Sequence, residues 1–132
     1  MATLVLRAAG PASVALVWQR YADPRRWSGW SPQIVRVDAG GATRITAGLR
    51  GRVWSVVGMS VPFEVLGVDE AVHSWTWRVG VGRAVLRLTH EVGPPGGGRG
   101  GGASTVLRAA GPWPLLAAYA PLARLALRRL VR

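Results

Sequence analysis

The sequence contains no cysteine, which excludes disulfides, thiolate metal sites and thiol catalysis together. Lysine and asparagine are also absent and isoleucine occurs twice, whereas Arg, Ala, Gly, Val and Pro are abundant. This usage is typical of a GC-rich genome, which supplies Arg where another genome supplies Lys. The absence of cysteine fits a reducing compartment.

Acidic residues are scarce. Six carboxylates stand against 17 arginines, so the formal net charge is +11. Codon usage explains Arg in place of Lys, but it does not explain the shortage of acids. The excess favours anionic partners such as nucleic acid, anionic lipid or a carboxylate ligand. Because the arginines are spread along the chain rather than grouped in blocks, we do not expect nucleic acid as the partner.

Long apolar runs are missing as well. The longest near the C-terminus covers residues 113–123 and ends at Arg124, short of the roughly 20 residues of a membrane-spanning helix. Arg7 and the Gly10-Pro11 pair interrupt the N-terminal apolar stretch, unlike a signal peptide. We therefore expect a soluble, cytoplasmic protein. Its 132 residues, 49% of them apolar, predict one domain, 1–132, with a sizeable core.

The hydrophobic pattern changes period along the chain. Apolar residues at Val14, Val17, Trp18 and Tyr21 predict an amphipathic helix, and alternation elsewhere predicts strands. Whether residues 39–49 form a further, irregular strand is left open by the pattern. The predicted strands cover 3–9, 33–38, 50–57, 61–69, 72–79, 84–92 and 104–110.

A second short helix is predicted around the string WSGWS, which covers residues 27–31. Asp23 is a good N-cap, Pro24 suits the first helical position, and Gly29 and Pro32 end the helix. The same string marks cytokine receptors, but there it follows a late strand in a secreted protein. We expect its two tryptophans to pack the short helices against the sheet.

The last two segments are a glycine-rich loop and a long helix. Residues 93–103 predict a flexible hairpin loop, because the stretch lacks the Lys-Ser/Thr ending of a phosphate-binding P-loop and no helix follows it. Residues 113–131 predict a helix bent at Pro121. The order indicates an α+β fold of β-α-α-β6 type, in which a strongly curved antiparallel sheet of six to seven strands wraps around the long helix. A tunnel is expected between them.

Three stretches resemble the SRPBCC superfamily of START-like and pollen-allergen-like helix-grip proteins, in its polyketide cyclase/dehydrase-like branch. They are VWQRYADPRRWSGWSPQIVRV at 17–37, VHSWTWRVGVG at 72–82 followed by LTHEV, and GPWPLLAAYAPLARLALRRL at 111–130. The resemblance covers residues 3–131. It implies a helix-grip fold and an apolar ligand, such as a lipid or polyketide, between sheet and helix. Some members catalyse cyclisation or dehydration, but the resemblance carries no catalytic residue over.

Alternation in the central hairpin places His73, Trp75 and Trp77 on one face, with His90 on the same side of the next strand. His73 is expected opposite His90 if the turn centres on 81–82, and diagonal to it if the turn centres on 80–81. Ordinary core packing is the alternative for every candidate residue. The candidate ligand-binding residues are Trp54, Phe63, Val65, Trp75, Trp77, Leu86, Leu88, His90, Leu107, Leu116, Tyr119 and Leu122.

Three functional hypotheses follow. The first is binding of a hydrophobic small molecule in the cavity. The second is a cyclase or dehydratase that uses His90, with Tyr119, as proton donor or acceptor. The third is contact with anionic lipid or nucleic acid through Arg124, Arg128, Arg129 and Arg132, whose alternative is a solvated helix face. No cofactor is implied, and two histidines alone do not make a typical zinc site, so we expect no metal.

Overall fold

The computed structural model describes residues 2–55, 58–95 and 101–132. Seven strands and a long C-terminal helix dominate it, with two short helices and a 3-10 turn between the first two strands. The elements are β1 (Ala2–Gly10), α1 (Val14–Ala22), η1 (Pro24–Arg26), α2 (Trp27–Trp30), β2 (Ile34–Asp38), β3 (Arg50–Ser55), β4 (Ser60–Asp69), β5 (Ser74–Val81), β6 (Ala84–Gly93), β7 (Ala103–Gly111) and α3 (Trp113–Leu130).

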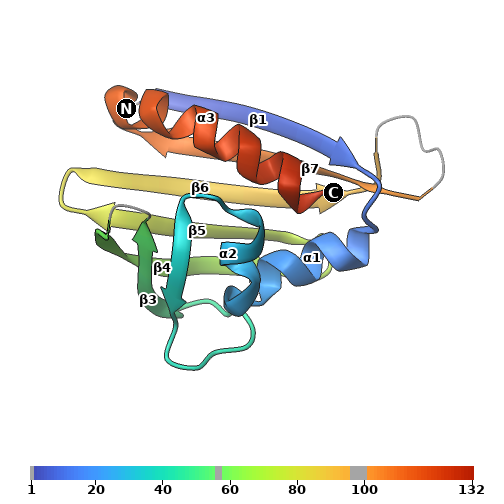
Figure 1. Ribbon diagram of the computed structural model, residues 1–132, viewed down its shortest axis with the longest axis horizontal. Coiled ribbons are helices and arrows are strands. Elements are labelled where there is room, and N and C mark those ends of the chain that lie inside the picture. The colour runs from blue at the N-terminus through green and yellow to red at the C-terminus, as the bar shows by residue number, and fades with distance from the viewer. Residues whose placement is uncertain (1, 56–57, 96–100) are drawn as a thin grey trace.

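All seven strands form one antiparallel sheet in the order β1-β7-β6-β5-β4-β3-β2. The strands from β2 to β7 follow one another as a meander, and β1 pairs along its whole length with β7. The register shifts in β2 and again in β4, and such bulges increase the bend of a sheet. Figure 1 shows α3 lying along β1 and β7 on the side of the sheet where α1 and α2 also pack. This arrangement confirms the predicted α+β fold.

Side-chain caps begin α1 and the 3-10 turn η1, whereas α2 follows η1 directly and has no side-chain cap of its own. The Ser13 hydroxyl accepts a hydrogen bond from the Leu16 N–H at 3.1 Å, and the Asp23 carboxylate accepts one from the Arg25 N–H at 3.0 Å. Pro24 opens the 3-10 turn that precedes α2, as its missing N–H and fixed φ favour. The predicted cap at Asp23 is therefore confirmed.

One of the three candidate residues on α3 lies off the buried face of this helix. The buried positions of α3 follow one another at intervals of seven, three, one and three residues, so they form one stripe against the sheet. Leu122 lies off this stripe and is 43% exposed, which corrects its assignment to the cavity. The buried residues are Leu116, Ala123, Ala126, Leu127 and Leu130.

One open point is decided and one local prediction, the position of the β5–β6 turn, is corrected. Residues 39–49 form no strand, although Ile45 is buried and its N–H donates to the Ala22 carbonyl at 2.7 Å. The turn between β5 and β6 centres on 82–83, so Trp75 rather than His73 pairs with His90. His73 precedes β5 with a φ of +52° and its ring lies against Trp18.

Parts of two other predictions lie outside the described residues. They are the end of the strand predicted at 50–57 and the middle of the glycine-rich loop at 93–103, because 56–57 and 96–100 are not described. Within the part of the chain that is described, no helix is long and apolar enough to cross a membrane.

Candidate functional site

A cavity of about 290 Å³ lies between the sheet and α3. Its walls come from α2, α3 and every strand except β1, so the curvature of the sheet creates it. Met59, which is 66% exposed, also lines the cavity, so the cavity reaches the surface beside this residue. No Arg, Asp or Glu among the described residues lines it.

Eight of the twelve predicted ligand-binding residues line this cavity. They come from β3, β5, β6, β7 and α3, which are far apart in the sequence. The eight are Trp54, Trp75, Trp77, Leu86, Leu88, His90, Leu107 and Tyr119.

The other four predicted residues do not line the cavity. Phe63 packs behind it, with its ring 5.2 Å from that of Trp27 and 5.7 Å from that of Trp77. Val65 and Leu116 are fully buried in the core, and Leu122 faces solvent. Phe63 lies deeper than expected because the indole rings of Trp27 and Trp77 cover it.

The sequence prediction missed the part of the wall that α2 and α3 supply. Trp27 and Trp30 were expected to serve packing alone, yet both line the cavity. Ala123 and Ala126 line it from α3, where small side chains leave space. Their spacing of three on a buried helix face was the available signal, because alanines on such a face leave room beside the sheet.

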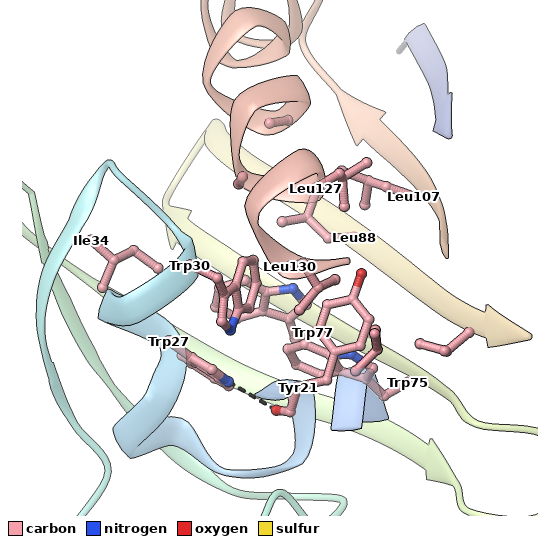
Figure 2. Packing of buried hydrophobic residues seen from close by; sticks show 14 of the residues in the cluster. Tyr21, Trp27, Trp30, Ile34, Trp75, Trp77, Leu88, Leu107, Leu127 and Leu130 are labelled. Atoms are coloured by element: carbon pink, nitrogen blue, oxygen red, sulfur yellow. Dashed lines mark hydrogen bonds between the residues drawn. The ribbon is translucent and has the colours of Figure 1, made fainter. Parts of the chain in front are cut away.

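Indole rings form one wall of the cavity. Trp75 stacks on Trp27 and on Trp77, with ring centroids 5.6 and 5.3 Å apart and interplanar angles of 26° and 25°. Figure 2 shows these rings, with Trp30 and Tyr21, gathered below Leu127 and Leu130 at the end of α3. The Trp27 indole N–H donates to the Tyr21 carbonyl at 2.9 Å, which fixes the ring. The wall is therefore flat, aromatic and held in place by the protein.

His90 is buried and both of its ring nitrogens are engaged. The Trp77 indole N–H donates to His90 Nε2 at 3.1 Å. Because an indole nitrogen only donates, Nε2 carries no proton and neutral His90 carries it on Nδ1. That Nδ1–H donates to the Tyr21 hydroxyl oxygen at 3.1 Å. The tautomer of His90 is thus set by Trp77.

The network continues to the main chain. Once Tyr21 accepts from His90, its hydroxyl donates to Thr105 Oγ1 at 2.7 Å, and the Thr105 hydroxyl donates to the Glu91 carbonyl at 3.0 Å. Burial lowers the pKa of His90 to about 3, so the ring is neutral near pH 7. Burial also raises the pKa of the Tyr21 hydroxyl. These groups are satisfied by one another and leave neither His90 nitrogen free for a ligand.

Other polar atoms at the cavity have no partner among the residues that the structure describes. Within the described residues, three buried side-chain atoms lack a hydrogen bond: Gln33 Oε1, Ser55 Oγ and Trp75 Nε1. All three residues line the cavity. Gln33 precedes Ile34, which pairs with Ser55, so the first two lie at the same end of the β2–β3 pair. Such unpaired groups are rare in folded proteins and call for an explanation.

Tyr119 brings a further polar group to the cavity. It is half-buried on α3, and burial raises the pKa of its hydroxyl, which therefore stays protonated near neutrality. It can donate a hydrogen bond to a ligand but is not poised to act as a base. Across residues 2–55, 58–95 and 101–132, no cluster of three or more His, Asp or Glu side chains is placed to hold a metal ion.

Comparison with solved structures shows the same fold in distant proteins. The di-domain aromatase/cyclase BexL from the BE-7585A biosynthetic pathway is 18% identical with a TM-score of 0.80, over 99% of this chain and 45% of that one. The protein XoxI from Bacillus cereus is 12% identical with a TM-score of 0.80, covering 99% and 94%. Ara h 8.0201 is 10% identical with a TM-score of 0.73, covering 98% and 94%.

No curated protein matches the sequence. The chain spans less than half the length of the di-domain cyclase, so the likeness concerns the fold that they share. A family model described as "Polyketide cyclase / dehydrase and lipid transport" matches residues 1–132. With the curved sheet, the long helix and the cavity between them, this match shows that the chain belongs to the polyketide cyclase/dehydrase and lipid transport family.

Proposed function

We propose that the protein binds a small, largely apolar and electrically neutral molecule in the cavity between the sheet and α3. The observation that carries this proposal is the cavity itself, which has indole and aliphatic walls and no charged side chain among its described lining residues. Burial of a charged group there would be costly without a partner, whereas apolar surface gains from the transfer. The family and the structural relatives support ligand binding of this kind.

The size of the cavity limits the ligand. An apolar cavity of about 150 Å³ accommodates benzene. A cavity of about 290 Å³ therefore suits a molecule of roughly two fused rings. The flat indole surface of Trp27, Trp75 and Trp77 favours an aromatic ring, because offset stacking adds to the gain from burial.

The unpaired atoms predict that the ligand carries a polar group. Gln33 and Ser55 line the cavity at the same end of the β2–β3 pair, and their atoms Oε1 and Oγ have no hydrogen-bond partner among the described residues. A ligand hydroxyl placed there would satisfy one or both of them. A site built around such groups discriminates against an analogue that lacks the hydroxyl, because the buried atoms are then left unpaired. We therefore expect 2-naphthol to bind more tightly than naphthalene.

The test is calorimetric titration of 2-naphthol into the wild-type protein and two variants. Ala126→Phe places a ring in the cavity, whereas Ala118→Phe adds the same ring to the exposed face of the same helix. The wild type and Ala118→Phe are expected to bind one molecule each, and Ala126→Phe at least about tenfold more weakly. Circular dichroism checks that both variants fold. Absence of saturable binding by the wild type, or equal binding by Ala126→Phe, would contradict the proposal.

A further inference from the structure

Trp30 lines a second concave surface as well as the cavity. This surface is a groove of about 530 Å³ formed by α1, η1, α2 and the end of α3. Five of its eight lining residues are arginines, and we refer to it as the arginine groove. The five are Arg20, Arg25, Arg26, Arg129 and Arg132.

One carboxylate, that of Asp23, offsets part of the positive charge of these five arginines. Asp23 accepts two hydrogen bonds from the Arg25 guanidinium, at 2.9 and 2.8 Å, and lies 3.8 Å from Arg26 Nε. The bond to Arg25 lowers the pKa of Asp23, which stays ionised. Counted over side chains, five guanidinium groups against one carboxylate leave a formal charge of +4 around the groove.

The remaining acids are engaged elsewhere, and none of them lines the groove. Three form ion pairs with other arginines, and two accept hydrogen bonds from the N–H groups of their own turns. The pairs are Glu70 with Arg44, Glu64 with Arg50 and Arg78, and Glu91 with Arg108, and the turn acceptors are Asp38 and Asp69.

Folding explains only part of this concentration of charge. Arg20 donates to the main-chain oxygens of Leu130 and Arg132, at 2.6 and 2.9 Å, and so caps the end of α3. Arg25 is held by Asp23. Arg129 and Arg132 are exposed and have no acidic partner among the described residues, although they lie in the same groove. Their like charges repel each other, and an anion bound between them would relieve this repulsion.

We infer that the arginine groove binds a compact, phosphate-bearing anion with at least two negative charges. The planar guanidinium group donates two parallel hydrogen bonds and matches phosphate oxygens well. A single carboxylate would neutralise only a quarter of the local charge, whereas a phosphate or diphosphate neutralises half or more. The groove has room for one or two phosphate groups, fewer than the four or more nucleotides of typical single-strand sites.

This inference does not depend on the proposed cavity ligand. No arginine among the described residues lines the cavity, and Trp30 is the only residue that appears in both described linings. The Ala126→Phe variant, which fills the cavity, is therefore expected to keep its affinity for the anion. A result that contradicts one proposal therefore does not contradict the other.

The test is calorimetric titration of pyrophosphate at constant ionic strength, with chloride as the background salt. The groove variant Arg129→Gln/Arg132→Gln removes two lining charges. Its matched control, Arg124→Gln/Arg128→Gln, removes two exposed charges from the same helix outside the groove. The wild type and the control are expected to bind one pyrophosphate with affinities within about twofold, and the groove variant at least about tenfold more weakly.

Two outcomes would overturn the inference. One is absence of saturable binding by the wild type. The other is equal weakening in both double variants, which would indicate attraction to the overall positive charge alone. Co-sedimentation with phosphatidic acid vesicles identifies the source of the phosphate. Displacement of the protein from vesicles by pyrophosphate points to a lipid headgroup, and binding of pyrophosphate without vesicle binding points to a free phosphate compound.

Discussion

Trp77 determines what His90 can do. Its indole N–H occupies His90 Nε2 and thereby places the imidazole proton on Nδ1, where Tyr21 accepts it. The sequence hypothesis of His90 as proton donor or acceptor required a free nitrogen facing the ligand. The network leaves neither nitrogen free, so the cavity offers a ligand the Tyr119 hydroxyl and the unpaired atoms of Gln33, Ser55 and Trp75 instead.

The buried, neutral state of His90 predicts that stability depends on pH. Its pKa is lowered to about 3 in the folded protein and is about 6.5 in the unfolded chain, so only the unfolded chain takes up this proton in between. The contribution of His90 to the free energy of unfolding is fully present above about pH 6.5 and is lost as the pH falls below that value. The free energy of unfolding should drop by about 1.4 kcal/mol per pH unit toward pH 4.5.

Urea unfolding of the wild type and His90→Gln between pH 7 and 4.5 measures this slope. Glutamine cannot titrate, so its slope should be flatter whatever its absolute stability. Carboxyl groups titrate mainly below this window. Parallel slopes in the two proteins would contradict the assignment of the proton to His90.

Two buried hydroxyl groups should respond in opposite ways to their removal. Thr105→Val leaves the Tyr21 hydroxyl without its acceptor and should lower the free energy of unfolding by about 1–3 kcal/mol. Ser55→Ala removes a group that has no partner, so stability should be unchanged or higher, while 2-naphthol binds more weakly. Thermal melts and titrations measure both quantities. A loss of stability in Ser55→Ala as large as that in Thr105→Val would show that Ser55 Oγ is satisfied within the protein.

At the scale of elements, the buried face of α3 could be predicted only in part from the pattern of its apolar residues. The helix is leucine- and alanine-rich on several sides, so more than one apolar stripe can be drawn through residues 113–131. The candidate residues on this helix included Leu122, which is exposed, but not Ala123 and Leu127, which are buried. The contact with β1, β7 and β6, which no local pattern reveals, decides which stripe is buried.

The different burial of Leu116 and Leu122 predicts that truncating them to alanine lowers the free energy of unfolding by different amounts. Leu116→Ala removes a fully buried side chain and should lower the free energy of unfolding by about 2–5 kcal/mol. Leu122→Ala acts on an exposed side chain and should cost no more than about 0.5 kcal/mol. Chemical denaturation measures both. Comparable costs would mean that Leu122 also packs against the sheet.

The β5–β6 hairpin shows how far strand register could be predicted. Alternation correctly placed Trp75, Trp77 and His90 on one face, because that depends only on the period of two. The pairing was shifted, because Gly80, Gly82 and Arg83 allow several turn positions and the actual turn is at 82–83. Trp75 therefore stands opposite His90, and His73 precedes the strand.

For the whole molecule, element order and resemblance were sufficient to predict the curved sheet and its long helix. The cavity lining was predicted only in part, because it depends on how strongly the sheet bends and on where α2 comes to lie. Trp27 and Trp30 illustrate this: their burial was expected, but their place in the cavity wall follows from the tertiary contacts of α2 with β2 and α3. The arginine groove likewise joins residues more than 100 positions apart in the sequence.

The central claim is that a neutral aromatic molecule lies inside the cavity. It is tested most directly by intermolecular nuclear Overhauser effects between 2-naphthol and the methyl groups of the protein. The claim predicts contacts from the ring protons to Leu86, Leu88 and Leu107, which line the cavity, and none to the exposed Leu122 and Leu125. Contacts confined to Leu122 and Leu125, or no contact with the three cavity leucines at saturation, would contradict it.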